Sequence, residues 1–398
     1  MLSLQNTYIL CYLLDLGCHL QLFPYQWDPT KKRVLPLLKS QLSIFQAHSL
    51  IMATMTAFSM YRFLQVQYIS GDEFPLSLKI MNSGWIGIYS LATIGLYQFG
   101  RHGEEIRTLV NWLLKYVEDQ QAAPKVQKRP KSREEIAQEK RLTRYLTFGI
   151  SLFAITPAAH AILVYESPCA PHFSSSLYFP CSGFPNGTGK TYHLLEKIPF
   201  IMIEYYLTTV IFTTISFNWA LLFLGISWIL YELKKLEAKL THSPRPGGFP
   251  TGQYRVLENI MKLINSSCRP YLATFSTILF AVVSLLLFGA IRVWHQDPGS
   301  NLMFPACGLR CFYEGITPLM LSGEVVKKNK KVIAQGKQIV YGRWILDQSR
   351  KRKLEKVWLN SCHGLRCEAG SLFTFENSIV IISLHNTMQL TLNFLVTF

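Results

Sequence analysis

Polar side chains recur within the last apolar segment of the chain, residues 373–397. Ser378, His385, Gln389 and Asn393 have the spacing that places side chains on roughly one stripe of an α-helix. Such groups are costly to desolvate, so a helix that faces only lipid gains nothing from them. They could line a water-filled pore shared by several subunits, or form hydrogen bonds between helices of one bundle. The sequence favours the pore.

Charged and aromatic residues also occur within the earlier apolar segments. Arg310 and Glu314 are one helical turn apart, and Glu204 stands alone. Because a charge at membrane depth pairs with a partner or faces protein or water, Arg310 and Glu314 are a structural ion pair or part of a ligand path. Aromatic and other ring-bearing residues form either a small-molecule pocket or interfacial belts. With Glu204, the pocket candidates are Trp85, Tyr89, His160, Tyr165, Phe200, Tyr205, Tyr206 and Tyr313.

Motifs for catalysis or metal binding are not found in the sequence. Residues 187–191, GTGKT, are similar to the end of a phosphate-binding loop, but the first glycine of that motif would be Phe184. No His/Cys spacing matches a zinc site, and no G-x-S-x-G or dinucleotide-binding loop occurs. We therefore predict no enzyme, no metal and no cofactor. The net charge of +16 is segregated between apolar runs, so no nucleic-acid partner is predicted either.

The elements that must position these residues are membrane-spanning helices. Charged residues are only 16% of the chain, whereas soluble domains average about 25%. About 20 mostly apolar residues are needed to cross a bilayer as a helix. Seven segments qualify, which predicts an all-α bundle of seven transmembrane helices: residues 43–63, 80–99, 145–165, 199–229, 271–294, 304–325 and 373–397.

The basic residues indicate the orientation of the bundle. Thirty-four of the forty lysines and arginines lie before the first span or in the loops after the second, fourth and sixth spans, whereas two lie in the remaining loops. Because cytoplasmic loops are enriched in these residues, we expect a cytoplasmic N-terminus and an extracellular C-terminus. The loop after the third span is then extracellular. It contains the glycosylation candidate Asn186, and Cys169 and Cys181, which form a disulfide or remain free thiols.

The N-terminal residues 8–23 are apolar, but they have no basic leader and no small-residue cleavage site. We therefore expect a helix on the membrane surface rather than a cleaved signal peptide.

Particular residues near both ends of the chain carry a family resemblance. Trp344 and the run 361–375, SCHGLRCEAGSLFTF, precede the polar last span, and Trp27-Asp28 precedes the first span. With the seven-span layout, these residues resemble the insect gustatory and odorant receptor superfamily. The layout covers the whole chain, and the sequence match covers about the last sixty residues.

Gustatory members of that superfamily often end with threonine-tyrosine, five residues, then glutamine-phenylalanine. One register places Ile382, Ser383, Gln389 and Leu390 on this pattern. The other places Asn386, Thr387, Asn393 and Phe394 there, and we favour it because four residues then remain after the motif. The partial match favours a divergent gustatory-like receptor over a typical odorant receptor.

The resemblance implies a tetrameric, ligand-gated cation channel in the plasma membrane. The expected partners are a small organic ligand, membrane lipid, permeating cations and three further subunits, identical or including a co-receptor. The ligand pocket is expected between the second, third, fourth and sixth spans. The seventh span would line the pore with Ser378, His385, Gln389 and Asn393, and the weaker candidates for a hydrophobic gate are Leu390, Phe394 and Val396.

This reading divides the chain into four parts. They are a cytoplasmic segment with the interfacial helix (1–42), six spans with the pocket (43–325), a cytoplasmic anchor (326–372) and the pore span (373–398). The alternative functions are a G-protein-coupled receptor, which needs the opposite orientation, and a secondary transporter, which needs matched internal repeats.

Overall fold

The computed structural model describes residues 4–37, 41–69, 75–122, 133–179, 192–242, 249–294, 298–344, 350–362, 364–368 and 374–397. The described chain is almost entirely helical. The helices are α1 (Leu4–His19), α2 (Leu42–Leu64), α3 (Leu76–Arg101), α4 (Gly103–Ala122), α5 (Arg133–Glu166), α6 (Leu194–His242), α7 (Thr251–Ser267), α8 (Arg269–Arg292), α9 (Pro298–Trp344), α10 (Arg350–Ser361) and α11 (Asn377–Thr397). A π-helical turn, Gln65–Ile69, extends α2, and a 3-10 turn, Ser174–Leu177, follows α5.

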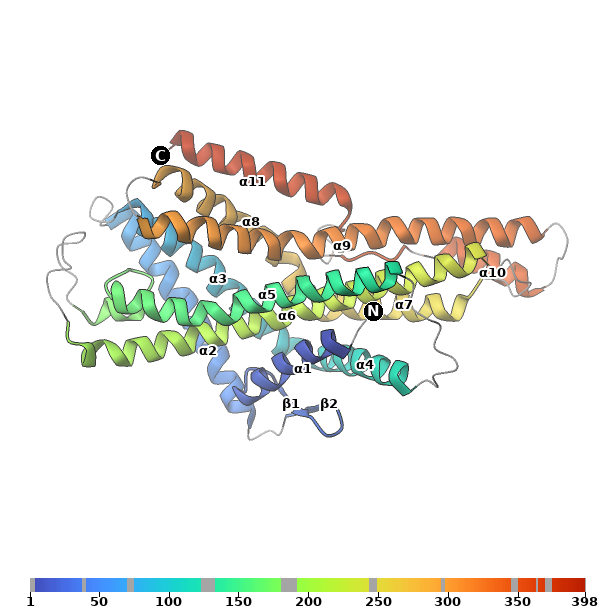
Figure 1. Cartoon of the computed structure of the whole chain (residues 1–398), viewed down its shortest axis with the longest axis horizontal. Helices are drawn as coiled ribbons and strands as arrows, with labels where there is room; N and C mark the ends of the chain where they lie inside the picture. Colours follow the sequence, from blue (N-terminus) through green and yellow to red (C-terminus); the bar gives the residue numbers. More distant parts are fainter. Residues whose placement is uncertain are drawn as a thin grey trace.

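The long helices set the shape of the molecule. Figure 1 shows α5, α6 and α9 along the long axis, with α11 at one edge and α1 and α4 at the other. At a rise of about 1.5 Å per residue, the 49 residues of α6 reach roughly 70 Å, more than twice the thickness of a hydrocarbon core. The ends of α6 and α9 near α10 therefore extend well past any single membrane crossing.

Helix α6 is the centre of the bundle. Every residue from 210 to 226 is buried, and α6 packs against α1, α3, α5, α7 and α9. A helix that is apolar on all sides is stable only when surrounded. Some of the polar side chains on α6 bind the backbone of the same helix: the Ser216 hydroxyl donates to the Phe212 carbonyl, and the Asn218 side chain donates to the Thr214 carbonyl.

A polar network joins α6 to its neighbours. The Gln98 side chain of α3 donates to the side-chain Oδ1 of Asn218 at 2.7 Å and accepts a hydrogen bond from the backbone N–H of Tyr271 at 3.1 Å. Tyr271 lies in the first turn of α8, where backbone N–H groups have no partner within the helix. This network therefore caps α8 and ties α3, α6 and α8 together.

A two-stranded hairpin near the N-terminus was not predicted. Strands β1 (Tyr25–Asp28) and β2 (Arg33–Pro36) pair antiparallel, and the Asp28 carboxylate accepts hydrogen bonds from Thr30 and from the Lys31 backbone in the connecting turn. These hydrogen bonds lower the pKa of Asp28, and the bond from the Thr30 hydroxyl contributes most. On the other edge, Asn111 of α4 exchanges two hydrogen bonds with the Val34 backbone, as a further strand would.

The all-helical prediction for the spans is confirmed. Each of the seven predicted segments overlaps a helix. However, α8 ends at Arg292 rather than 294, α11 begins at Asn377 rather than 373, and α9 continues without interruption from the sixth span to Trp344. Among the described residues, four helices are long and apolar enough to cross a membrane: Glu139–Glu166, Leu194–Thr241, Arg269–Arg292 and Asn377–Thr397. The predicted N-terminal helix is α1, which packs on α4, α5 and α6.

Gly95 of α3 tests the packing around α6. A Cβ at this position would lie 2.8 Å from both Asn218 Nδ2 and Thr214 Cγ2, and hydrogen bonds hold Asn218 in place. Overpacking of this kind costs about 1–3 kcal/mol. We expect Gly95→Ala to lower the thermal melting temperature of the purified protein in detergent.

The matched control is Gly84→Ala on the same helix, where an added Cβ meets nothing within 4 Å. That variant should melt at or above the wild-type temperature. Equal melting temperatures for the two variants would contradict the packing described for Gly95.

Candidate ligand cavity and outward-facing helix

A cavity of about 250 Å³ lies between α3, α5, α6, α8 and α9. It occupies the half of the bundle away from α10, because its lining comes from the C-terminal part of α5 and the N-terminal parts of α3 and α9. The volume is slightly below the roughly 300–1,000 Å³ of typical small-molecule sites. The lining residues are mainly apolar and include Met81, Trp85, Leu152, Ile155, Phe212, Leu286, Met303 and Cys307.

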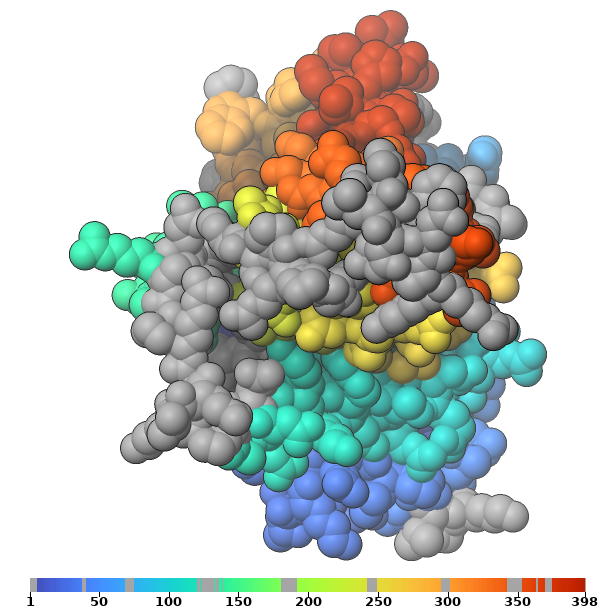
Figure 2. Space-filling view, turned by 90° about the vertical axis from the view of Figure 1, so that its right-hand side faces the viewer, coloured from blue at the N-terminus to red at the C-terminus, as the bar shows by residue number. Residues whose placement is uncertain are grey.

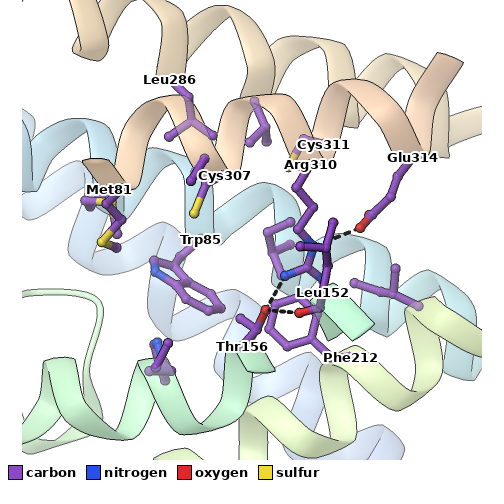
Figure 3. A pocket seen from close by; sticks show the side chains of 18 of the residues that line it. Met81, Trp85, Leu152, Thr156, Phe212, Leu286, Cys307, Arg310, Cys311 and Glu314 are labelled. Carbon is purple, nitrogen blue, oxygen red and sulfur yellow. Dashed lines mark hydrogen bonds and ion pairs between the residues drawn. The ribbon is translucent and has the colours of Figure 1, made fainter. Parts of the chain in front are cut away.

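One face of α9 brings the charged groups of the cavity wall. Met303, Cys307, Arg310 and Glu314 follow each other at helical spacing, so they share that face. Figure 3 shows the Arg310 side chain crossing the cavity from α9 towards Thr156 of α5. Its Nε donates to Glu314 Oε1 at 2.8 Å, and the side chains of Arg310 and Glu314 are only 11% and 4% exposed.

The Arg310 guanidinium also contacts aromatic rings. Its central carbon is 4.5 Å from the ring centre of Phe153 and 4.3 Å from that of Phe212. Nη1 donates to the Thr156 hydroxyl, which in turn donates to the Leu152 carbonyl at 2.7 Å. Arg310 thus links α9 to α5 through Thr156, while its ion pair with Glu314 lies within α9 and forms part of the cavity wall.

The segment after α5 folds back over the bundle beside the cavity. Residues 170–173 are buried, and the Glu204 carboxylate of α6 accepts the backbone N–H and the hydroxyl of Ser174. His160 Nε2 lies 3.4 Å from the other Glu204 oxygen. The Trp85 ring centre is 4.3 Å from that of His160 and 6.2 Å from that of His172. Glu204 therefore fixes the returning segment, and Trp85 connects this segment to the cavity.

The predicted pocket residues fall into three groups. Trp85 and His160 line the cavity. Tyr89 is buried next to Trp85, Glu204 binds Ser174, and Phe200 packs against Tyr178 and Phe179. The outlying residues are Tyr165 and Tyr205, which are exposed, Tyr206, which hydrogen-bonds His48, and Tyr313, which donates to the Tyr145 carbonyl.

The cavity also contains residues that the sequence did not single out. Helix α8 contributes Leu279, Val282 and Leu286, whereas the pocket was expected between the other four helices. Leucine, isoleucine and methionine in a span have no sequence signal that separates a cavity wall from a packed core. Arg310 and Glu314 had such a signal, since two charges one turn apart at membrane depth require an explanation.

The backbone hydrogen-bonding of α9 is interrupted next to the cavity, at Glu314. Pro318 is inside the helix and has no N–H, so the Glu314 carbonyl loses its usual partner four residues later. The indole Nε1 of Trp219 on α6 donates to that carbonyl at 3.2 Å. A side chain of the central helix thus replaces the missing backbone donor.

Helix α11 packs on α8 and α9 and exposes most of its surface. Its buried side chains are Thr387 and Thr391, and the Ser284 hydroxyl of α8 donates to the Thr387 carbonyl. Figure 2 shows the red atoms of α11 projecting at the edge of the molecule. Among the predicted pore residues, all but Phe394 are exposed: Ser378, His385, Gln389, Leu390, Asn393 and Val396.

By helical periodicity, Ser378, His385 and Gln389 lie opposite the buried threonines of α11. Phe394 lies on the bundle side, where its ring centre is 5.8 Å from that of Phe288 on α8. The polar stripe of this helix therefore faces away from its own chain.

Two predictions concern residues 180–191. Cys169 is disulfide-bonded, but its predicted partner Cys181 lies outside the described residues, and so does the glycosylation candidate Asn186. Both the Cys169–Cys181 pairing and the glycosylation therefore stay predictions.

The arrangement of helices is similar to that of solved insect olfactory receptors. The structure of the insect olfactory receptor OR5 from Machilis hrabei in complex with eugenol matches with a TM-score of 0.67, covering 98% of each chain at 12% identity. The structure of OR5 without a named ligand matches with a TM-score of 0.62, covering 98% of this chain and 96% of that one at 11% identity. No protein-family profile and no curated sequence matches. The chain therefore has the insect olfactory receptor fold.

The Trp219 contact yields a prediction about α9. Trp219→Phe removes the donor to the Glu314 carbonyl, and leaving a buried acceptor unpaired costs about 1–3 kcal/mol. Pro318→Ala restores a backbone N–H that can reach the same carbonyl. We expect Trp219→Phe to destabilise the Pro318→Ala protein less than it destabilises the wild type. The difference between the two effects, measured by melting in a double-mutant cycle, should be about 1 kcal/mol.

Pro305→Ala, at another proline of α9, is the control background, and there the two substitutions should be additive. Additivity in both backgrounds would contradict the exchange of donors at Glu314.

Proposed function

We propose that this chain, which has the fold of insect olfactory receptors, is a subunit of a ligand-gated cation channel that detects small organic molecules. The channel is a multi-pass protein of the plasma membrane and assembles from four subunits, either four copies of this chain or copies together with a co-receptor. Its ligands are tastants or odorants.

The outward face of α11 is the observation that carries this proposal. A helix apolar enough to span a membrane exposes most of its surface, with amides and an imidazole opposite its packed side. In one isolated chain these polar groups would face hydrocarbon, at a high desolvation cost. The α11 helices of several subunits around a common axis would give them water. Ser378, His385, Gln389 and Asn393 are the pore-lining residues in this arrangement.

The exposed apolar residues Leu390 and Val396 are the candidates for a hydrophobic gate near the C-terminal end of the pore. We leave Phe394 out of the gate, because it packs on Phe288 of the same chain. The cavity between α3, α5, α6, α8 and α9 is the ligand site. A ligand that binds the open state more tightly than the closed state would increase the open fraction.

Thiol modification tests the pore assignment. In cells expressing Gln389→Cys, a positively charged, water-soluble thiol reagent should reduce the current evoked by a panel of small volatiles, because it places charge in the pore. The matched control is Thr391→Cys, whose side chain is buried against α8. Wild type gives the baseline for the native thiols. An unchanged current for Cys variants at 378, 385 and 389 would contradict the pore assignment.

Cation selectivity is tested with the same cells. Replacing extracellular sodium by a large organic cation should shift the reversal potential of the evoked current to more negative values. A reversal potential that follows chloride instead would contradict a cation channel.

The proposed orientation gives an independent prediction. Tags at both termini should be accessible on intact cells only at the C-terminus, and Asn186→Gln should abolish glycosidase sensitivity. Asn265→Gln, at a second sequon on the side proposed as cytoplasmic, is the matched control and should not change it. An accessible N-terminus would contradict the orientation and with it the channel arrangement.

A further inference from the structure

The guanidinium of Arg310 has hydrogen-bond donors that the protein does not use. Arginine carries five N–H donors. Nε binds Glu314, and Nη1 binds the Thr156 hydroxyl. Nη2 is buried and has no hydrogen-bond partner in the part of the chain that the structure describes. An unpaired buried donor on a cation is costly, so its retention beside a cavity points to an occupant that accepts from it.

The surroundings of Nη2 limit the rest of that occupant. The hydroxyl hydrogen of Thr156 is not available to a ligand, because it is donated to the Leu152 carbonyl. Apart from Trp85, His160 and two thiols, the other lining residues are apolar, for example Met81, Ile155 and Met303. His160 Nε2 lies 3.4 Å from Glu204, and the other ring nitrogen, Nδ1, is buried without a hydrogen-bond partner among the described residues. A ligand that fills this space therefore buries a largely apolar body, and among the described lining residues its one charged hydrogen-bond donor is Arg310.

The charge balance of the cavity decides between a neutral and an anionic acceptor. Among the residues that the structure describes, Arg310 is the only lysine or arginine that lines the cavity, and Glu314 at 2.8 Å already neutralises it. A carboxylate on the ligand would bring a second negative charge beside Glu314 with no further cation to balance it. A carbonyl or ether oxygen accepts the hydrogen bond without adding charge.

We infer that Arg310 is the specificity-determining residue of the cavity, and that it selects small, largely apolar molecules with a neutral acceptor oxygen, which binds Nη2. Figure 3 shows the guanidinium held between Thr156 and Glu314, so its orientation is fixed before the ligand arrives. This inference deepens the proposed function and rests on it for the identity of the cavity as the ligand site.

Three probes with the same eight-carbon chain separate the alternatives. They are octane, methyl hexyl ketone and octanoate, which carry no acceptor, a neutral acceptor and a carboxylate. Binding to the full-length purified protein is followed by intrinsic tryptophan fluorescence, since Trp85 lines the cavity. Each probe also partitions into detergent, but this effect cancels when the ratio of two affinities is compared between protein variants.

Wild type should bind the ketone about tenfold more tightly than octane, as expected for one hydrogen bond from a charged donor. It should bind octanoate more weakly than the ketone. Replacing Arg310 alone would leave Glu314 buried and unpaired, so the informative variant is Arg310→Leu with Glu314→Leu. This double variant should lose the preference for the ketone over octane while still binding both.

Arg310→Gln with Glu314→Gln serves as a second variant if the leucine pair does not fold, and it should show a reduced preference. Met303→Leu changes the lining without altering any polar group, and it should retain the wild-type preference.

A ketone preference that survives in the folded double variants would overturn the assignment to Arg310. Tighter binding of octanoate than of the ketone would overturn the neutral class of ligand, and so would binding of none of the probes to wild type. Current recordings in cells are read separately. A preference for the ketone that depends on Arg310, without any evoked current, would support the inference and contradict the channel. An evoked current without this preference would support the channel and contradict the inference.

Discussion

The complete burial of α6 is the constraint on which the rest of the bundle depends. Residues 210–226 have no exposed side, so helices must surround them whatever lies outside. Close packing leaves little room on this helix, and the glycines that face it, such as Gly95 and Gly149, allow α3 and α5 to approach its side chains. The cavity accordingly lies beside α6 rather than along it, and α6 contributes only Phe212 and Ile215 to the lining.

The polar groups of this central helix specify which neighbour lies where. Asn218 joins Gln98 of α3, Trp219 joins the Glu314 carbonyl of α9, and Glu204 joins Ser174 in the segment after α5. Apolar contacts tolerate sliding between helices, whereas each of these hydrogen bonds requires one register. Beyond the proposed membrane region the same role passes to charges, since Glu237 of α6 binds both Lys328 and Lys331 of α9.

Much of the fold could be predicted from the sequence, because long apolar runs have few alternatives to helices. The polar stripe of α11 was also visible, since Ser378, His385 and Gln389 recur at helical spacing in an otherwise apolar span. The hairpin was missed because Asn111, distant in sequence, completes its edge. The position of Glu204 could not be predicted either, because its partner Ser174 lies in a segment whose return into the bundle has no local signal. The apolar cavity residues could not be predicted either, because they line a cavity only where no other side chain packs against them.

Pro318 of α9 has a mechanical consequence. On one side of Pro318, Arg310 ties the helix to α5, and on the other, Lys328 and Lys331 clamp it to α6. Between these anchors, the helix replaces one of its own hydrogen bonds with a side-chain contact from Trp219. We therefore expect α9 to bend more easily at Pro318 than along its regular turns. A displacement of the cavity wall would then change the kink angle at Pro318 rather than the curvature of the whole helix.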